Sequence, residues 1–139
     1  MTVATILLPL FVHVALVFVI VFRLGYTRRA ALQAGEVGPA GLTDPGAFPK
    51  PAVLAANSLR NQFELPVLFY VLTILALITR KADIAFLVLA WVFVLSRIAH
   101  AFVHVTSNDL KLRFPLWLVG FFCLLLMWIL FAADILLNV

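Results

Sequence analysis

Charged residues are scarce in this chain of 139 residues, where they make up 12% of the sequence. Hydrophobic residues make up 65%, a share above the range of soluble globular domains. There is a single cysteine, Cys123, so no disulfide can form within the chain. The low charge and high hydrophobicity exclude a soluble globular fold and predict an integral membrane protein. The single cysteine excludes a fold stabilised by an internal disulfide.

The sequence also lacks a cluster of basic residues that would favour nucleic-acid binding. Lys and Arg number 10 against 6 Asp and Glu, which gives a formal net charge of +4. These cations stand singly beside apolar segments and form no stripe, so membrane topology explains them better than a polyanionic partner. We therefore expect no nucleic acid among the partners and a lipid bilayer as the surroundings.

Four apolar segments are long enough to cross a bilayer as helices, which takes roughly 20 residues each. They comprise residues 3–22, 52–79, 84–105 and 114–137. So short a chain with one long polar loop has no room for a separate soluble domain. The sequence predicts an all-α antiparallel bundle of four transmembrane helices, forming a single domain over residues 1–139.

The connections between these spans differ in length and composition. Glycine and proline break any periodicity in residues 35–51, which predicts a water-exposed loop. Residues 23–34 can extend the first helix up to the start of this loop. The second connection is a tight turn ending at Asp83, a residue type that caps helices. The third comprises residues 106–113, and Pro115 is then expected in the first turn of the last helix.

Basic residues near the ends of the spans predict the orientation of the chain in the membrane. The second connection carries two of them, Arg80 and Lys81, whereas the first and third connections together carry six. Those six are Arg23, Arg28, Arg29, Lys50, Lys111 and Arg113. We therefore expect the first and third connections in the cytoplasm and both termini outside.

Polar residues interrupt the second apolar segment. Arg60, Asn61 and Glu64 are separated by one, three and four residues, and separations of three and four place side chains on one helix face. An ionisable group in hydrocarbon costs about 2.5–3.5 kcal/mol on insertion scales, so such groups tend to mark a site. Pro66 cannot donate a hydrogen bond to the carbonyl of Gln62, so we expect the helix to bend beside Glu64.

A second polar group stands near the end of the third span. Arg97, His100 and His104 also share a helix face. At a rise of about 1.5 Å per residue, Arg97 and Arg60 both lie roughly 12 Å from the cytoplasmic ends of their helices. Arg113 stands at the start of the last span. The spacing predicts that these side chains meet at one depth.

Two interpretations of this cluster remain open. In one, Arg60, Glu64 and Arg97 pair with each other and hold the helices together without a ligand. In the other, the cations outnumber the single clear carboxylate, and an anionic ligand neutralises the buried surplus.

The run Arg60-Asn61-x-x-Glu64, followed by Arg97-x-x-His100, resembles the MAPEG family, the membrane-associated proteins in eicosanoid and glutathione metabolism. The four-span length, the long first connection and the short later ones are similar too. The resemblance implies a homotrimer that binds glutathione between adjacent protomers near the cytoplasmic face. It also implies a bacterial-type member in an inner membrane, with glutathione-dependent transferase or peroxidase activity toward hydrophobic electrophiles.

The same resemblance implies roles for individual residues. Arg113 is similar to the arginine near the reacting thiol of eicosanoid-synthesising members, and Arg97 is the second catalytic candidate. The eukaryotic enzymes of the family carry additional basic residues at the positions of residues 57–59, and this chain lacks them. They also carry hydroxyl side chains at the positions of residues 114–117, and this chain has none there. A detoxifying activity therefore fits better than eicosanoid synthesis. The glutathione-binding residues implied are Arg60, Asn61, Glu64, Arg97, His100 and His104.

The sequence leaves other functions open, and it carries a histidine and a cysteine outside the proposed roles. The alternatives are a non-catalytic membrane subunit of a larger assembly, a small transporter, and an electron carrier with haem held by histidines of two helices. His100 and His104 have the spacing of two metal ligands, but no third ligand is evident and we expect no metal. His13 is expected to make a hydrogen bond between helices, and Cys123 to be a packed thiol.

Overall fold

The computed structural model describes residues 1–137, which contain five α-helices and no strand. Four helical stretches are long and apolar enough to cross a membrane, and α2 and α3 together form one of them. The all-α fold with four spans is therefore confirmed, and the chain is an integral membrane protein. The helices are α1 (Val3–Gln33), α2 (Lys50–Asn61), α3 (Leu65–Ile78), α4 (Ile84–Val105) and α5 (Leu110–Leu136), with short 3-10 turns η1 (Pro39–Leu42) and η2 (Pro45–Ala47).

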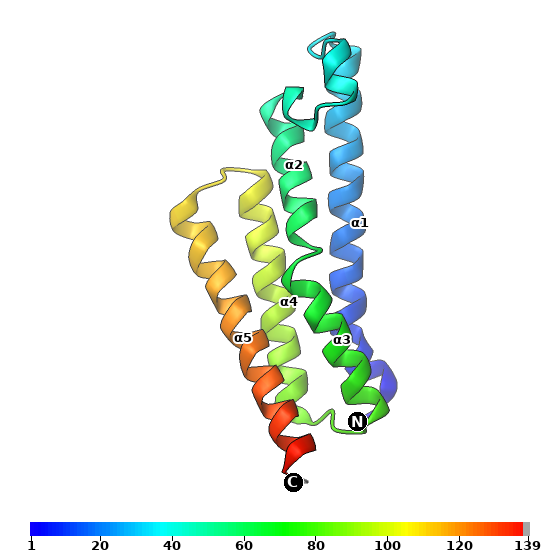
Figure 1. The fold of residues 1–139 in the computed structure, drawn as a ribbon, viewed down its shortest axis with the longest axis vertical. Helices are drawn as coiled ribbons and strands as arrows, with labels where there is room; N and C mark the ends of the chain where they lie inside the picture. The colour runs from blue at the N-terminus through cyan, green and yellow to red at the C-terminus, as the bar shows by residue number, and fades with distance from the viewer. Residues whose placement is uncertain (138–139) are drawn as a thin grey trace.

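The helices run along a common axis, and the described ends of the chain lie at the same end of the bundle (Figure 1). We call this the terminal end, and it also carries the turn formed by residues 79–83. The opposite, or loop, end carries residues 34–49 and 106–109. Helix α4 packs most extensively against α5, while α1 packs against α2, α3 and α4.

Helix α1 continues beyond residue 22 and ends at Gln33. This confirms the helical extension after the first apolar segment, so the helix is longer than that segment. Its 31 residues correspond to about 46 Å at the usual helical rise, against roughly 30 Å of hydrocarbon. Gly35 ends the helix with φ of +68°, a conformation that glycine adopts freely. The Glu36 N–H then donates to the Ala31 carbonyl at 3.1 Å, and the Gly35 N–H donates to Leu32 at 3.2 Å.

The second span is broken, not bent, and the break lies at residues 62–64. Here the amides of Gln62, Phe63 and Glu64 donate to carbonyls three residues earlier, at 3.0, 3.0 and 3.5 Å. Pro66 is the second residue of α3, where its missing N–H costs no helical hydrogen bond. The expected distortion next to Glu64 is confirmed, but a new helix starts there because proline is best accommodated in a first turn.

Both short connections end at an aspartate that caps the next helix. Asp83 Oδ1 accepts from the Phe86 N–H at 2.7 Å, which confirms the predicted cap. Asp109 Oδ1 accepts from the Lys111 N–H at 2.9 Å and starts α5 earlier than predicted. Pro115 consequently lies in the second turn of α5, so the expectation of a first-turn position was wrong.

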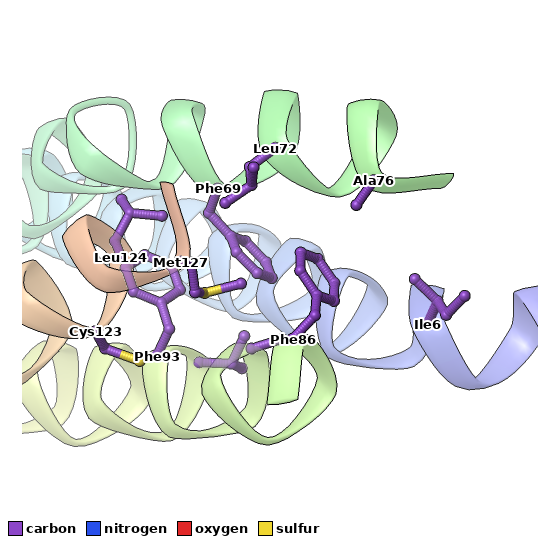
Figure 2. Close-up of a cluster of buried hydrophobic side chains, with 11 residues drawn as sticks. Ile6, Phe69, Leu72, Ala76, Phe86, Phe93, Cys123, Leu124 and Met127 are labelled. Carbon is purple, nitrogen blue, oxygen red and sulfur yellow. The ribbon is translucent and has the colours of Figure 1, made fainter. Parts of the chain in front are cut away.

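The hydrophobic core lies among α1, α3, α4 and α5 (Figure 2). The rings of Phe69 and Phe93 form its centre, with centroids 4.8 Å apart. Outward-facing side chains such as Phe22 remain exposed, as expected for a surface that meets lipid or another protein copy. Because lipid is as apolar as the core, close packing and hydrogen bonds stabilise this bundle more than apolar burial does.

Candidate functional site

A polar pocket lies toward the loop end of the bundle, among α2, α4 and the start of α5. Its volume is about 290 Å³. The lining contains one permanent cation and no carboxylate, so the pocket favours an anion. The lining residues are Asn61, His100, Leu110, Arg113, Phe114 and Trp117.

Arg97 lies behind this pocket and is completely buried within the protomer. Its Nη2 donates to Asn61 Oδ1 at 2.8 Å, while Nε and Nη1 have no hydrogen-bond partner among residues 1–137. Glu64 interacts with this guanidinium through its charge. Arg97 therefore supports the Asn61 amide from inside the bundle, and Asn61 presents the polar surface to the pocket.

The two histidines of α4 are buried one turn apart. The His100 and His104 rings meet edge to face with centroids 5.7 Å apart. Within the part of the chain that the structure describes, the Nδ1 atom of each ring is buried and has no hydrogen-bond partner. Of the two side chains, His100 lines the pocket. His100 thus contributes its ring to the pocket lining, while its Nδ1 atom is buried.

Arg113 enters the pocket from the first turn of α5, where Asn108 holds it. The Arg113 Nη1 donates to Asn108 Oδ1 across the start of the helix. Asn108 has φ of +52°, in the left-handed region that asparagine tolerates better than most residues. Trp117, which also lines the pocket, stacks on Phe121 one turn farther along α5, with ring centroids 5.4 Å apart. The cation is thus positioned by local structure at the helix start.

Arg60 and Glu64 lie on the exposed surface of the protomer, outside the pocket lining. The break after Asn61 removes the continuous helix face that their spacing implied. The structure therefore brings Asn61, His100 and Arg113 together at the pocket and leaves Arg60 and Glu64 facing outward. Both charges are placed where a second protein copy could reach them.

A second polar layer, which sequence reasoning largely missed, lies deeper in the bundle. His13 Nδ1 and the Tyr70 hydroxyl are 2.6 Å apart, which confirms the hydrogen bond between helices expected of His13. Gln62 is fully buried and donates from Nε2 to the Ser58 carbonyl at 3.2 Å. Gln62 and the Arg97 charge both lie near His13, so this layer adjoins the pocket support.

The tautomer of His13 depends on whether Nδ1 or the Tyr70 hydroxyl donates the hydrogen bond between them. If Tyr70 donates to Nδ1, the ring proton is on Nε2, and that atom has no partner. Gln62 Oε1 is a neighbouring acceptor that also lacks one. The two unsatisfied atoms are matched as donor and acceptor.

Some of the missed residues left a signal in the sequence. Gln62 stands inside the same polar run as Arg60, and Asn108 precedes a capping aspartate. Tyr70 left none, because its partner is 57 residues away. Cys123 is buried with its Sγ 3.0 Å from the Leu89 carbonyl, as expected of a packed thiol. Among residues 1–137, no group of three His, Cys, Asp or Glu side chains is placed to hold a metal ion.

A comparison with models of protein families gives a match over most of the chain. The model of the MAPEG family matches residues 6–133, which include the second and third spans in full and the first and fourth apart from three residues at their outer ends. No curated protein matches the chain. No solved structure matches it either. Since the match covers most of the sequence, the chain belongs to the MAPEG family.

Proposed function

We propose that this protein is a glutathione-dependent membrane transferase or peroxidase that acts on hydrophobic electrophiles. The observation that carries the proposal is the convergence of Asn61, His100 and Arg113 on one pocket without a lining carboxylate. Membership in the MAPEG family supports it. Glutathione carries two carboxylates and one ammonium group at neutral pH, so its net charge suits this lining.

The donors around the pocket fit such a tripeptide. Arg113 offers a guanidinium to an anionic group of the ligand, and hydrogen bonds between charged groups are shorter and stronger than neutral ones. The His100 ring and the Asn61 amide line the same pocket and would supply further polar contacts. Arg97 adds positive charge from behind without touching the ligand, and its bond to Asn61 keeps that amide oriented.

Bound glutathione would supply a thiol, which reacts as its thiolate. Arg113 would stabilise the negative sulfur, because a nearby cation lowers the pKa of a thiol. The ring of Trp117 would shield this charge from lipid on one side. Arg113 is held by Asn108, so the cation is in place before the ligand arrives.

An apolar groove of about 380 Å³ between α3 and α5 would hold the electrophile. Phe121 lines this groove, and its stacking on Trp117 connects it to the polar pocket. Leu65 and Leu125 line it as well, and no charged residue does. A substrate dissolved in the bilayer could therefore enter beside the site without crossing water.

The exposure of Arg60 and Glu64 supports a homotrimer in which a neighbouring copy covers them. A charge that faces lipid is costly, whereas one at an interface can pair. The glutathione site would then be completed between protomers. Native mass spectrometry in mild detergent should give a trimer for the natural protein. A monomer or dimer would contradict this part of the proposal.

The loop end would face the cytoplasm, with both termini outside and the protein in a bacterial inner membrane. The excess of basic residues in the first and third connections supports this orientation. A reporter fused after Val139 should be active only if it folds on the outer side. Strong activity of a cytoplasmic reporter at that position would reverse the orientation.

Titration calorimetry with glutathione tests the binding site. Arg113→Gln should weaken binding by about 2 kcal/mol, or roughly 30-fold, because a charged hydrogen bond is lost. Lys111→Gln is the matched control. Lys111 is exposed on the same helical turn, and its substitution removes the same unit of positive charge. Equal loss in both variants would mean general electrostatic attraction, and no binding to the natural protein would refute the site.

Activity separates an enzyme from a non-catalytic member of the family. The natural protein should conjugate glutathione to 1-chloro-2,4-dinitrobenzene or reduce cumene hydroperoxide, and Arg113→Gln should lose most of this activity. Binding without activity toward either probe would favour the alternative, a membrane subunit that keeps the fold.

A further inference from the structure

A second groove, separate from the candidate site, runs between α1 and α4 toward the loop end. Its volume is about 240 Å³. Apolar side chains line it, from Leu16 and Ile98 at its inner part to Val105 and Arg23 at the loop end. Arg23 is the charged residue of this lining, so the groove is apolar along its length and cationic at one end.

The position of Arg23 along α1 places that end at the surface of the membrane. Arg23 is 20 residues beyond Val3, the first residue of the helix, which corresponds to about 30 Å of helical rise. This equals the hydrocarbon thickness of a typical bilayer, roughly 30 Å. Tyr26 follows one turn later and is 72% exposed, as is common for tyrosine at the level of lipid headgroups.

The Arg23 guanidinium is available for a ligand. It is exposed, and within residues 1–137 its side chain has no hydrogen bond or ion pair. An adjoining pocket of about 390 Å³ extends from Arg23 along the end of α1, with Tyr26 and Thr27 in its lining. Glu36 is the acidic residue of that pocket and lies beyond the end of α1.

We propose that this groove is a binding site for an anionic glycerophospholipid. One acyl chain would lie between α1 and α4, and the phosphate would accept hydrogen bonds from Arg23. Basic pockets between transmembrane helices are known to bind anionic headgroups, and charge and depth both match here. The proposal is independent of glutathione, because the groove and the polar pocket share no lining residue.

Native mass spectrometry of the delipidated protein tests the site. The protein is mixed with equal amounts of phosphatidylglycerol and phosphatidylcholine that carry the same acyl chains. The natural protein should retain phosphatidylglycerol preferentially, and Arg23→Gln should reduce that preference about fivefold. Arg29→Gln is the matched control, because Arg29 is exposed on the same helix but lines neither pocket.

A variant of the apolar part tests the acyl-chain position. Val19 lines the groove and is 62% exposed, so Val19→Trp should fold and cover the groove. It should reduce the retention of both lipids while Arg23 remains. Equal effects of Arg23→Gln and Arg29→Gln would overturn the proposal in favour of general attraction to a basic face.

Two further outcomes would also overturn it. Displacement of phosphatidylglycerol by millimolar inorganic phosphate would assign Arg23 to a free anion. Retention of neither lipid by an intact oligomer, with dissociation of that oligomer by Val19→Trp, would assign the groove to a neighbouring copy of the chain.

Discussion

The hydrogen bond between Arg97 and Asn61 is the interaction on which the stability of the buried cation depends. Arg97 has 0% exposure, and Asn61 Oδ1 is the acceptor of its one side-chain hydrogen bond. Asn61→Ala removes that acceptor. A hydrogen bond to a charged group contributes about 1.5–3 kcal/mol, and a buried donor left unsatisfied costs about 1–3 kcal/mol, or more when it is charged. We expect Asn61→Ala to destabilise the protein by about 2–4 kcal/mol.

Removal of the charge itself should have the opposite consequence. Arg97→Met deletes the cation together with its two unpartnered nitrogens, and an apolar side chain of similar length fills the space. Such replacements are often neutral or stabilising, so we expect a change within about 1 kcal/mol. The double variant Asn61→Ala with Arg97→Met should then resemble Arg97→Met alone. The coupling energy between the two sites should be about 2 kcal/mol or more.

The measurement is unfolding by SDS in mixed micelles, followed by tryptophan fluorescence. Asn57→Ala is the control, because Asn57 is exposed one turn earlier on α2 and gains the same helix propensity from alanine. If Asn61→Ala is no more destabilising than Asn57→Ala, Arg97 does not rely on Asn61. If Arg97→Met is the more damaging change, the cation stabilises the fold and the reasoning fails.

Three further predictions concern packing, buried hydrogen bonds and helix caps, each measured by the same SDS unfolding. Gly120→Ala should destabilise the protein by about 1–3 kcal/mol, because the added Cβ would lie 2.9 Å from Ser96 Oγ. A second change, Ser96→Ala, should restore much of the lost stability, and the absence of this rescue would contradict the prediction. Tyr70→Phe should cost about 1–3 kcal/mol because His13 Nδ1 loses its partner, and a combined His13→Leu change should reduce the cost; a neutral Tyr70→Phe would argue against the bond. Asp83→Ala should cost about 0.5–2 kcal/mol through the lost cap of α4, and an effect below that range would mean the cap is replaced by water.

Much of the candidate site could be recognised from the sequence, because ionisable residues in an apolar span are rare for an energetic reason. The positions of Asn61, His100 and Arg113 were identified in this way. Their division into lining, supporting and outward-facing residues was not. It depends on the direction of each side chain, and the break after Asn61 changes that direction within one turn.

Of the helix starts, one was predicted from the sequence and another was not. Asp83 caps α4 as the sequence predicts, because capping involves residues only a few positions apart. The start of α5 at Leu110 and the position of Pro115 were not predicted. In that segment a polar cap begins the helix before the apolar run does, and hydropathy alone does not detect it.

The sequence by itself determined the membrane environment and the number of spans. These follow from composition and from the fixed rise of a helix, which are local properties of the chain. The tertiary structure decided which polar groups meet, such as Arg97 with Asn61 across 36 residues and His13 with Tyr70 across 57. Such pairs depend on the packing and rotation of whole helices, and neighbouring residues in the sequence carry no record of either.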